Sequence, residues 1–249
     1  MTRAGTRIDV WVTAFDERRG EAGDAGGEAA ERAGLAVLDT DERARAARFV
    51  RPVDRRRFVV AHALLRRTLA DYTGVAPADL VIEARPCLQC GEPHGKPGLV
   101  GPGPEFNLTH SAGVVAVAVA PDRPVGLDVQ EMRELDHRGL SRRFFSPAER
   151  ADIEAHGDAA GLERFHQLWA RKEAVLKATG EGITGGLGEV DAREPLSGPL
   201  VVPARDERGP LMVVDVPLPA GLDLTAGEAY AMAVAAPGTD WAVRAHVAR

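Results

Sequence analysis

Residues 162–180, LERFHQLWARKEAVLKATG, repeat the pattern of residues 54–74, DRRRFVVAHALLRRTLADYTG, half a chain earlier. Each segment brings apolar side chains to one face at helical spacing, which predicts a long amphipathic helix in each half of the chain. A shorter helical segment precedes each of them, DTDERARAARF at residues 39–49 and SPAERADIEAH at residues 146–156. Both shorter segments open with a capping box, formed by Asp39 with Glu42 and by Ser146 with Glu149.

Strand-like segments follow the helical segments in each half. FNLTHSAGVVAVAVA at residues 106–120 predicts two strands joined by a polar turn, and the second strand is echoed by YAMAVAAP at residues 230–237. Three echoes in the same order indicate a duplicated α+β unit. We therefore predict an α+β fold of two similar lobes, residues 1–122 and residues 123–249, with a ligand cleft at their junction.

Two segments follow neither the helical nor the strand period. Residues 15–36 are rich in glycine, alanine and charged residues, and we expect a mobile loop or insertion there. Residues 83–104 are rich in proline and glycine and are also expected to form a loop.

The composition argues against several classes of protein. No apolar run approaches the roughly 20 residues that span a bilayer, so we expect neither a membrane protein nor a signal peptide. Two cysteines among 249 residues cannot form a disulfide framework, and we expect a cytoplasmic protein. The net charge of −6 argues against a general nucleic-acid binder.

Only three of the 31 basic residues are lysines: Lys96, Lys172 and Lys177. Because the chain otherwise uses arginine, a retained lysine indicates a position that needs a compact, flexible point charge. The alternative is that the three lysines were retained by chance and have no particular role. Lys96 lies in Gly-Lys-Pro, between a glycine and a proline, in a loop that can approach a ligand closely.

Two acidic residues are candidates for a magnesium site. Asp128 ends a short apolar strand, and Glu173 lies on the second long helix, on the same stripe as Lys177. Carboxylates from a strand end and from a helix can together hold Mg²⁺, which prefers oxygen ligands. The plainer alternative is an ordinary surface ion pair between Glu173 and Lys177, one helical turn apart.

The remaining polar candidates each have two interpretations. His110 follows a strand, beside the hydroxyls of Thr109 and Ser111, but a lone histidine is more often structural than functional. The arginine-rich run at residues 43–57 suits either a solvated helix face or a phosphate site.

Cys87 and Cys90, together with His94, resemble half a zinc knuckle. No second pair of ligands accompanies them in the sequence, and a structural zinc ion needs four ligands. A zinc site here is therefore the weaker interpretation.

Four segments, taken in order, resemble the surfactin-type 4′-phosphopantetheinyl transferases. They are FNLTHS (106–111), VGLDVQ (125–130), FFSPAE (144–149) and LWARKEAVLKATGEG (168–182), with GKP (95–97) upstream. The resemblance covers about residues 38–187, and the ordered set of motifs is more specific than any one of them. The chain departs from the family's pattern at Gln130, where most members have a second acid.

The resemblance implies two lobes related by pseudo-two-fold symmetry, with coenzyme A in the cleft between them. It implies Mg²⁺-dependent transfer of the phosphopantetheinyl arm of coenzyme A to a serine of an acyl or peptidyl carrier protein, with release of adenosine 3′,5′-bisphosphate. A monomer is expected, because the two lobes supply the symmetry internally. The alternatives are a non-catalytic module that binds coenzyme A or carrier proteins, which Gln130 favours, and a Mg²⁺-dependent nucleotide hydrolase.

The same resemblance implies roles for individual residues. The expected metal-binding residues are Asp128, Gln130 and Glu173. Glu173 is also the candidate to accept the serine proton, and the expected catalytic residues are Glu173, Lys177 and His110. The expected contacts to coenzyme A are Lys177 and His110 at the diphosphate, Lys96 on the adenine side, and Arg45 and Arg57 at the 3′-phosphate. Thr109 and Pro97 are also expected to bind coenzyme A.

Overall fold

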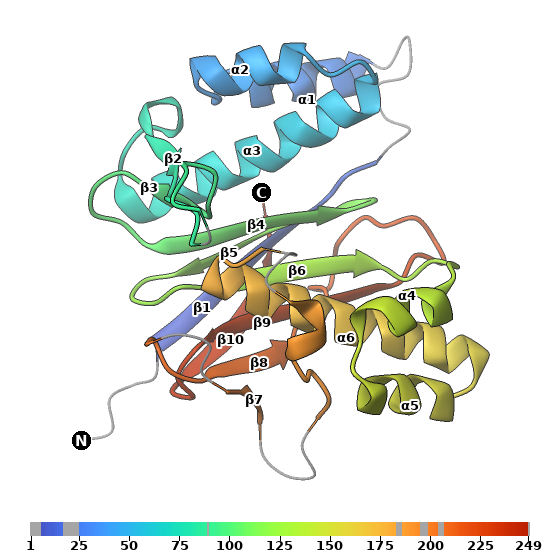
Figure 1. Cartoon of the computed structure of the whole chain (residues 1–249). Helices are drawn as coiled ribbons and strands as arrows, with labels where there is room; N and C mark the ends of the chain where they lie inside the picture. Colours follow the sequence, from blue (N-terminus) through green and yellow to red (C-terminus); the bar gives the residue numbers. More distant parts are fainter. Residues whose placement is uncertain are drawn as a thin grey trace.

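Two four-stranded sheets pack against each other, and each carries a long helix on its outer side (Figure 1). The strand order is β10-β1-β5-β4 in the first sheet and β6-β9-β8-β7 in the second, and β2 and β3 form a separate hairpin. The computed structural model describes residues 6–16, 25–88, 90–182, 186–194, 199–203 and 207–248. None of the helices in these ranges is both long enough and apolar enough to cross a membrane.

The elements have the following bounds. The helices are α1 (Ala25–Leu35), α2 (Thr40–Ala47), α3 (Pro52–Thr73), α4 (His137–Phe144), α5 (Pro147–Ala155) and α6 (Asp158–Thr179). The strands are β1 (Thr6–Ala14), β2 (Ile82–Ala84), β3 (Pro97–Leu99), β4 (Glu105–Ser111), β5 (Val114–Ala120), β6 (Gly126–Glu131), β7 (Leu200–Val202), β8 (Leu211–Asp215), β9 (Tyr230–Pro237) and β10 (Trp241–Val247).

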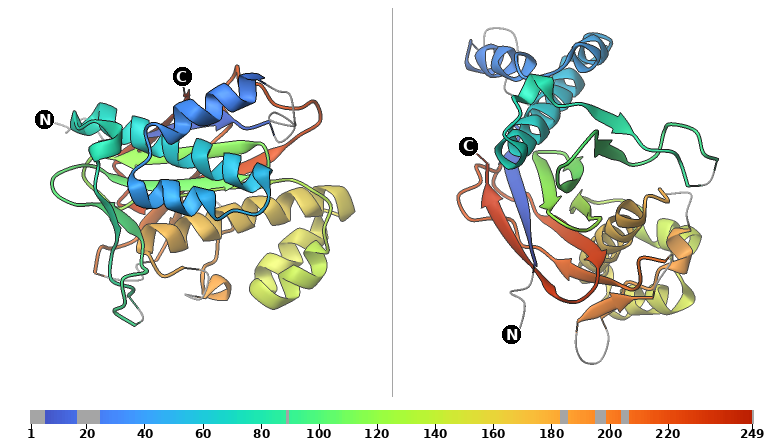
Figure 2. Two further views of the ribbon diagram at one scale, coloured as in Figure 1. Left: turned by 90° about the horizontal axis from the view of Figure 1, so that it is seen from above. Right: turned by 90° about the vertical axis from the view of Figure 1, so that its left-hand side faces the viewer.

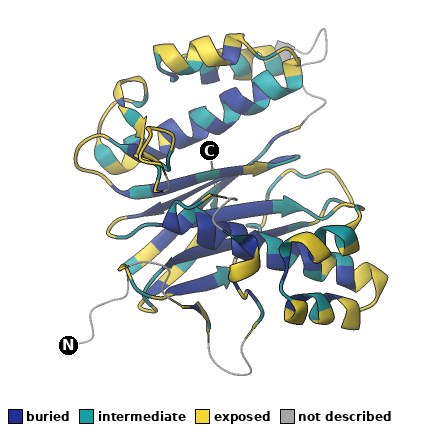
Figure 3. Cartoon of the chain, viewed as in Figure 1, coloured by how far each residue is buried: buried dark blue, intermediate teal, exposed yellow. Residues whose placement is uncertain are grey.

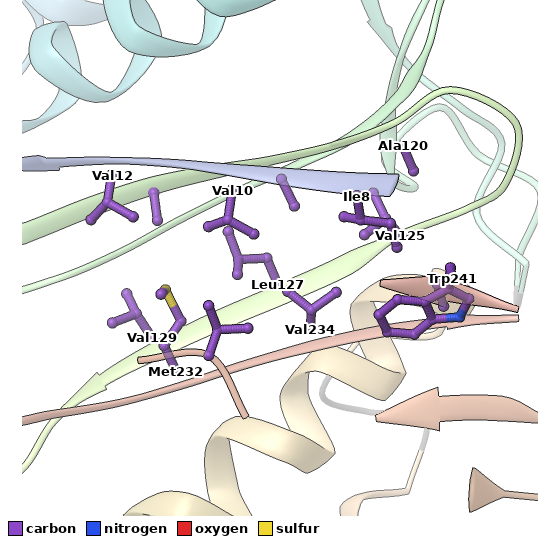
Figure 4. Close-up of a cluster of buried hydrophobic side chains, with 14 of the residues drawn as sticks. Ile8, Val10, Val12, Ala120, Val125, Leu127, Val129, Met232, Val234 and Trp241 are labelled. Carbon is purple, nitrogen blue, oxygen red and sulfur yellow. The ribbon is translucent and has the colours of Figure 1, made fainter. Parts of the chain in front are cut away.

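The continuous apolar runs of β5 and β9 follow from this layering. Successive side chains of a strand point to opposite faces, so both faces of a strand between two layers must be apolar. In β5, Val115 and Val117 pack against α3, whereas Val114 and Ala116 enter the core between the sheets. Figure 4 shows this inter-sheet core, where Leu127 of β6 and Val234 of β9 lie beneath Val10 of β1.

The structure confirms the α+β class and the two long helices, α3 and α6. Both capping boxes are formed, at Asp39 with Glu42 and at Ser146 with Glu149. The shorter helices are the more exposed parts: α1 and α2 pack along α3, and α5 packs along α6 (Figures 2 and 3).

Two loop predictions are partly wrong. Within residues 15–36, Ala25–Leu35 is helix α1, whereas residues 17–24 lie outside the described ranges. A Cβ on Gly34 would lie 2.6 Å from Val59, so the small residue lets α1 pack closely on α3. Within residues 83–104, Pro97–Leu99 pairs with Ile82–Ala84 to form the β2–β3 hairpin.

The last strand departs from the expected division of the chain at residue 122. β10 pairs in parallel with β1, with Thr6 opposite Trp241, and so belongs to the first sheet. The Trp241 side chain is buried in the core between the sheets. The end of the chain therefore closes the first sheet, although the sequence halves assign it to the second lobe.

The third lysine, Lys172, is a fully buried structural residue. Its ammonium donates to both carboxylate oxygens of Glu149, at 2.7 and 2.6 Å, and to the carbonyl oxygen of Val190 at 2.5 Å. The Glu149 carboxylate also accepts from the backbone of Ser146 and Ala192. One buried pair thus joins α5, α6 and the segment after α6.

Lys172→Met is expected to lower the free energy of unfolding by about 3–5 kcal/mol, because it leaves the Glu149 carboxylate buried without its cation. The double variant Glu149→Gln/Lys172→Met is expected to recover much of that loss, since no buried charge remains. Urea unfolding of the three proteins measures both effects. A loss below about 1 kcal/mol for Lys172→Met, the range of exposed pairs, would contradict a buried ion pair.

Candidate active site

Strand β4, at the edge of the first sheet, lies against β6, at the edge of the second. Residues 107, 109 and 111 share one face of β4 because side chains alternate along a strand. The Asn107 side-chain oxygen accepts from the Leu127 backbone N–H at 3.0 Å, and the Ser111 hydroxyl accepts from the Glu131 backbone N–H at 2.9 Å. These bonds form a polar seam between the two sheets, and Thr109 lies in the middle of it.

The seam holds a buried acid and a lysine. Asp128 accepts from the Thr109 hydroxyl at 3.2 Å and from the Lys177 ammonium at 2.5 Å. Lys177 also donates to the Thr109 hydroxyl and to the Leu127 carbonyl oxygen, both at 3.2 Å. Three elements, β4, β6 and α6, therefore meet at one carboxylate.

Gly126, the first residue of β6, allows α6 to reach this seam. A Cβ at this position would lie 1.8 Å from the Ala174 carbonyl oxygen and 2.4 Å from the Ala178 nitrogen. Only glycine admits such a close approach of two backbones. The contact fixes the position of α6 relative to β6, so that Glu173 and Lys177, on neighbouring turns of α6, face Asp128.

Glu173 is buried beside this cluster, with only 6% of its surface exposed. Its Oε1 atom has no hydrogen-bond partner in the described part of the chain. Burial and the nearby charge of Asp128 raise the pKa of Glu173, and Lys177 opposes them. The surface ion pair expected as the plainer alternative is wrong, because Glu173 is buried and Lys177 bonds Asp128.

Gln130 donates from its side-chain nitrogen to the second oxygen of Asp128 at 2.6 Å. The amide thus lies where most members of the resembled family have an acid, and it bonds the neighbouring carboxylate. In this arrangement Gln130 orients Asp128.

The donor set of the cluster fits a magnesium ion. Two carboxylates, Asp128 and Glu173, come from different elements and interact through space, and one of their oxygens is buried without a partner. A divalent cation would relieve both the repulsion and the unsatisfied oxygen, and carboxylate oxygens suit Mg²⁺. The Lys177 ammonium supplies positive charge at the same carboxylate.

A pocket of about 320 Å³ opens at one end of the seam. Lys96, Pro97, Asn107 and Lys177 all line it. The Lys96 ammonium donates to the Val125 carbonyl oxygen at 2.6 Å, and burial lowers the pKa of Lys96 to about 8. Two of the three lysines, one just before β3 and one on α6, are therefore brought to one pocket.

A second pocket, of about 620 Å³, opens at the other end of the seam. His110, Gln130 and Arg57 line it, so α3, β4 and β6 contribute to one wall. Loss of hydration, followed by the charges of Arg57 and Lys177, lowers the pKa of His110. The wall of the pocket is not uniformly cationic, because it also includes the acids Asp16, Glu131 and Glu228.

Arg45 lines neither of these pockets. Its guanidinium lies 5.2 Å from the ring centroid of Phe58, on which His62 also stacks. The structure thus brings Arg57 to the His110 pocket and gives Arg45 a packing contact elsewhere on α2 and α3.

Two polar residues of the seam, Asn107 and Ser111, were not expected as a set. The period of two along β4 was the signal that could have found them, since they flank Thr109 at two positions on either side. The bonds that they accept from β6 cannot be read from the sequence, because they depend on which strand edge faces β4.

Comparison with known proteins identifies the family of the chain. The model of the 4′-phosphopantetheinyl transferase superfamily matches residues 124–234. The chain is 32% identical over 188 residues to a 4′-phosphopantetheinyl transferase of Nostoc sp., which is 74% of this chain and 73% of that protein. It is 32% identical over 174 residues to a 4′-phosphopantetheinyl transferase of Bacillus pumilus, 70% of this chain and 71% of that protein.

A Synechocystis sp. protein, whose name assigns the same activity provisionally, is 36% identical over 166 residues. The match spans 65% of this chain and 65% of that protein. The matched superfamily segment includes Asp128, Gln130, Glu173 and Lys177, which the structure brings together at the seam. The chain belongs to the 4′-phosphopantetheinyl transferase superfamily.

Proposed function

We propose that the chain, a phosphopantetheinyl transferase by its family, moves the 4′-phosphopantetheine arm of coenzyme A to a serine hydroxyl of apo acyl or peptidyl carrier proteins. The serine oxygen forms a bond to the phosphorus that carries pantetheine, and the bond from that phosphorus to the adenosine-side oxygen breaks. Adenosine 3′,5′-bisphosphate leaves. The observation that carries this proposal is the buried, unpartnered oxygen of Glu173 beside the bonded pair of Asp128 and Lys177.

Coenzyme A would lie along the seam, in a cleft between two lobes related by a pseudo-two-fold axis. Each half of the chain supplies a sheet edge to the seam, a long helix and a capping-box glutamate that pairs with a buried cation. The pairs are Glu42 with Arg66 and Glu149 with Lys172. This correspondence supports the symmetry, and the pockets at both ends of the seam support the placement.

Asp128 and Glu173 would hold the magnesium ion, which when bound neutralises charge on the diphosphate. Lys177 lies at the same carboxylate and would bind a diphosphate oxygen. His110 would donate to the diphosphate from the opposite end of the seam, and the anionic ligand would favour its protonated form. Positioned charges of this kind stabilise the charge that develops in the transition state.

Glu173 is the group that would accept the serine proton. Its Oε1 atom is buried without a partner in the described part of the chain, so this oxygen is available to accept the proton of a serine hydroxyl held beside it. Lys96 and Pro97 would contact the adenine side of coenzyme A in the smaller pocket. We also propose that the enzyme acts as a monomer in the cytoplasm, without binding nucleic acid or membrane.

Arg57→Ala is expected to weaken the binding of coenzyme A by roughly 10- to 150-fold, because a charge-assisted contact to the 3′-phosphate is lost. The binding of 3′-dephospho-coenzyme A is expected to weaken far less. Arg45→Ala is expected to show the same selective loss, because Arg45 is the second residue proposed to contact the 3′-phosphate. Calorimetric titration of both ligands measures the ratio. If Arg57→Ala weakens the binding of both ligands equally, Arg57 does not contact the 3′-phosphate.

Intact-mass spectrometry of an apo carrier domain, after incubation with the enzyme, coenzyme A and Mg²⁺, tests the proposed function. A gain of one phosphopantetheine on the carrier serine, with adenosine 3′,5′-bisphosphate in solution, is the expected result. A non-catalytic binding module would leave the carrier mass unchanged and coenzyme A intact. A nucleotide hydrolase would cleave coenzyme A without modifying the carrier.

A further inference from the structure

The loop between β2 and β3 brings three potential metal ligands together at its tip. The ligand atoms of Cys87, Cys90 and His94 all lie within 4.8 Å of one another. The Cys90 Sγ and the His94 Nε2 atoms are 3.0 Å apart. Ligands around a tetrahedral zinc ion lie about 3.5–3.8 Å apart, given bonds of about 2.3 Å to sulfur and about 2.0 Å to nitrogen. The cluster therefore needs only small movements to surround an ion.

Backbone hydrogen bonds hold this loop in a compact shape. The Gly91 N–H donates to the Cys87 carbonyl oxygen and the Cys87 N–H donates to the Glu92 carbonyl oxygen, both at 2.8 Å. Gly91 has a φ of +78°, a backbone conformation that favours glycine. A Cβ on Gly95 would lie 2.6 Å from the Arg85 carbonyl oxygen. The turn and the close approach thus place the three side chains independently of any ion.

We propose that Cys87, Cys90 and His94 bind a zinc ion, with a water molecule as the fourth ligand. Thiolate and imidazole together are a typical zinc donor set, and sites with three protein ligands complete the tetrahedron with water. The two thiols are not joined in a disulfide. The phosphoryl-transfer cluster on the seam uses oxygen ligands, so the two sites differ in the metal that they favour.

The zinc ion would fix the loop that carries Lys96. His94 is two residues before Lys96, and Lys96 immediately precedes β3. Cys87 and His94 line the same pocket as Lys96 and Lys177. An ion at the tip of the loop therefore limits the positions that the Lys96 ammonium can take. Zinc would affect this pocket by holding the loop in place.

Metal analysis of the full-length chain, purified under reducing conditions without a metal-binding tag, tests the site directly. We expect one zinc per chain, and after exchange for cobalt, the visible bands of a tetrahedral ion with a thiolate-to-cobalt charge-transfer band. Since Cys87 and Cys90 are the chain's only cysteines, that band has a single origin. Cys87→Ser, Cys90→Ser and His94→Ala are each expected to abolish it.

His156→Ala, at an exposed histidine after α5, is the matched control and should retain metal and spectrum. A reduced chain that contains no zinc and gives no charge-transfer band on cobalt titration would overturn the proposal. Undiminished zinc in Cys90→Ser or His94→Ala would overturn it equally. Hydrogen exchange in residues 85–96 is expected to be faster in the zinc-free protein and in His94→Ala.

The effect on coenzyme A rests on the proposed function. Removal of zinc with a zinc-selective chelator, at constant Mg²⁺, is expected to raise KM for coenzyme A several-fold with kcat little changed. An unchanged KM would show that the ion does not position Lys96. A chain that transfers nothing in either zinc state would refute the proposed function and leave the metal analysis to decide the zinc site.

Discussion

Glu173→Gln abolishes transfer while the fold stays intact: this is the largest effect expected of any single substitution. The change keeps the size of the side chain but removes the charge of the proposed magnesium ligand and proposed base. General-base catalysis alone contributes roughly 100- to 10,000-fold, and the metal contribution adds to it. The rate of holo-carrier formation at saturating coenzyme A measures the loss. Near-normal turnover with Mg²⁺ would refute the assignment of Glu173.

Although it abolishes transfer, the same variant is expected to be more stable than the wild-type protein when Mg²⁺ is absent. Because burial raises the pKa of Glu173, the folded state binds its proton more tightly than the unfolded state does. The free energy of unfolding of the wild-type protein therefore falls as the pH rises through this raised pKa. Glu173→Gln removes that penalty, and without Mg²⁺ it is expected to be the more stable protein at about pH 8.

Changes in pH and in Mg²⁺ concentration give two further tests of this difference in stability. The stability advantage of Glu173→Gln is expected to shrink as the pH falls below the raised pKa, where the wild-type carboxyl is protonated. It is also expected to shrink when Mg²⁺ is added, since the ion binds and stabilises only the wild-type site. Urea unfolding across pH, with and without Mg²⁺, gives both trends. A variant that is less stable at high pH and unaffected by Mg²⁺ would mean that Glu173 is satisfied without metal.

Asp128→Ala is expected to lower transfer by roughly 100- to 1,000-fold, the scale found when a group that stabilises transition-state charge is removed. Asp128 accepts from Lys177, Thr109 and Gln130, so its loss also frees the positioned cation. Gln130→Ala is expected to cost no more than about tenfold, because it removes one neutral donor to Asp128. The Mg²⁺ dependence of the transfer rate compares the two.

Gln130→Glu completes this series. A carboxylate at this position is expected to tighten Mg²⁺ and to keep or raise turnover, because it adds a third acid to the site. Without Mg²⁺ the added charge lies against Asp128, so the variant should depend more strongly on the ion. If Gln130→Ala proves as inactive as Asp128→Ala, the amide is an essential ligand and a site of two carboxylates is wrong.

The local parts of the fold could be predicted because their signals are local. The periods of α3 and α6, the two capping boxes and the β4–β5 hairpin depend on residues within a turn or two of each other. Helix α1 was missed because its glycines read as loop, whereas Gly34 serves the close packing on Val59. The place of β10 could not be predicted, because its pairing with β1 joins opposite ends of the chain.

In the candidate site, too, local signals could be predicted from the sequence and tertiary contacts could not. The motifs supplied Asp128, Glu173 and Lys177, and the structure brings Asp128 and Lys177 into direct contact. Helical spacing offered Glu173, one turn away, as the alternative partner of Lys177, whereas the structure pairs Lys177 with Asp128 from a strand. Gly126 explains why: the close approach of α6 to β6 is a tertiary contact that helical spacing alone does not reveal.

The most direct test of the proposed site is a crystal structure of the chain with coenzyme A and Mn²⁺ in place of Mg²⁺. An anomalous peak for the ion is expected between the Asp128 and Glu173 carboxylates. The diphosphate is expected to contact that ion, Lys177 and His110, with the adenine side toward Lys96. An ion bound elsewhere, or coenzyme A in a pocket away from the β4–β6 seam, would contradict it.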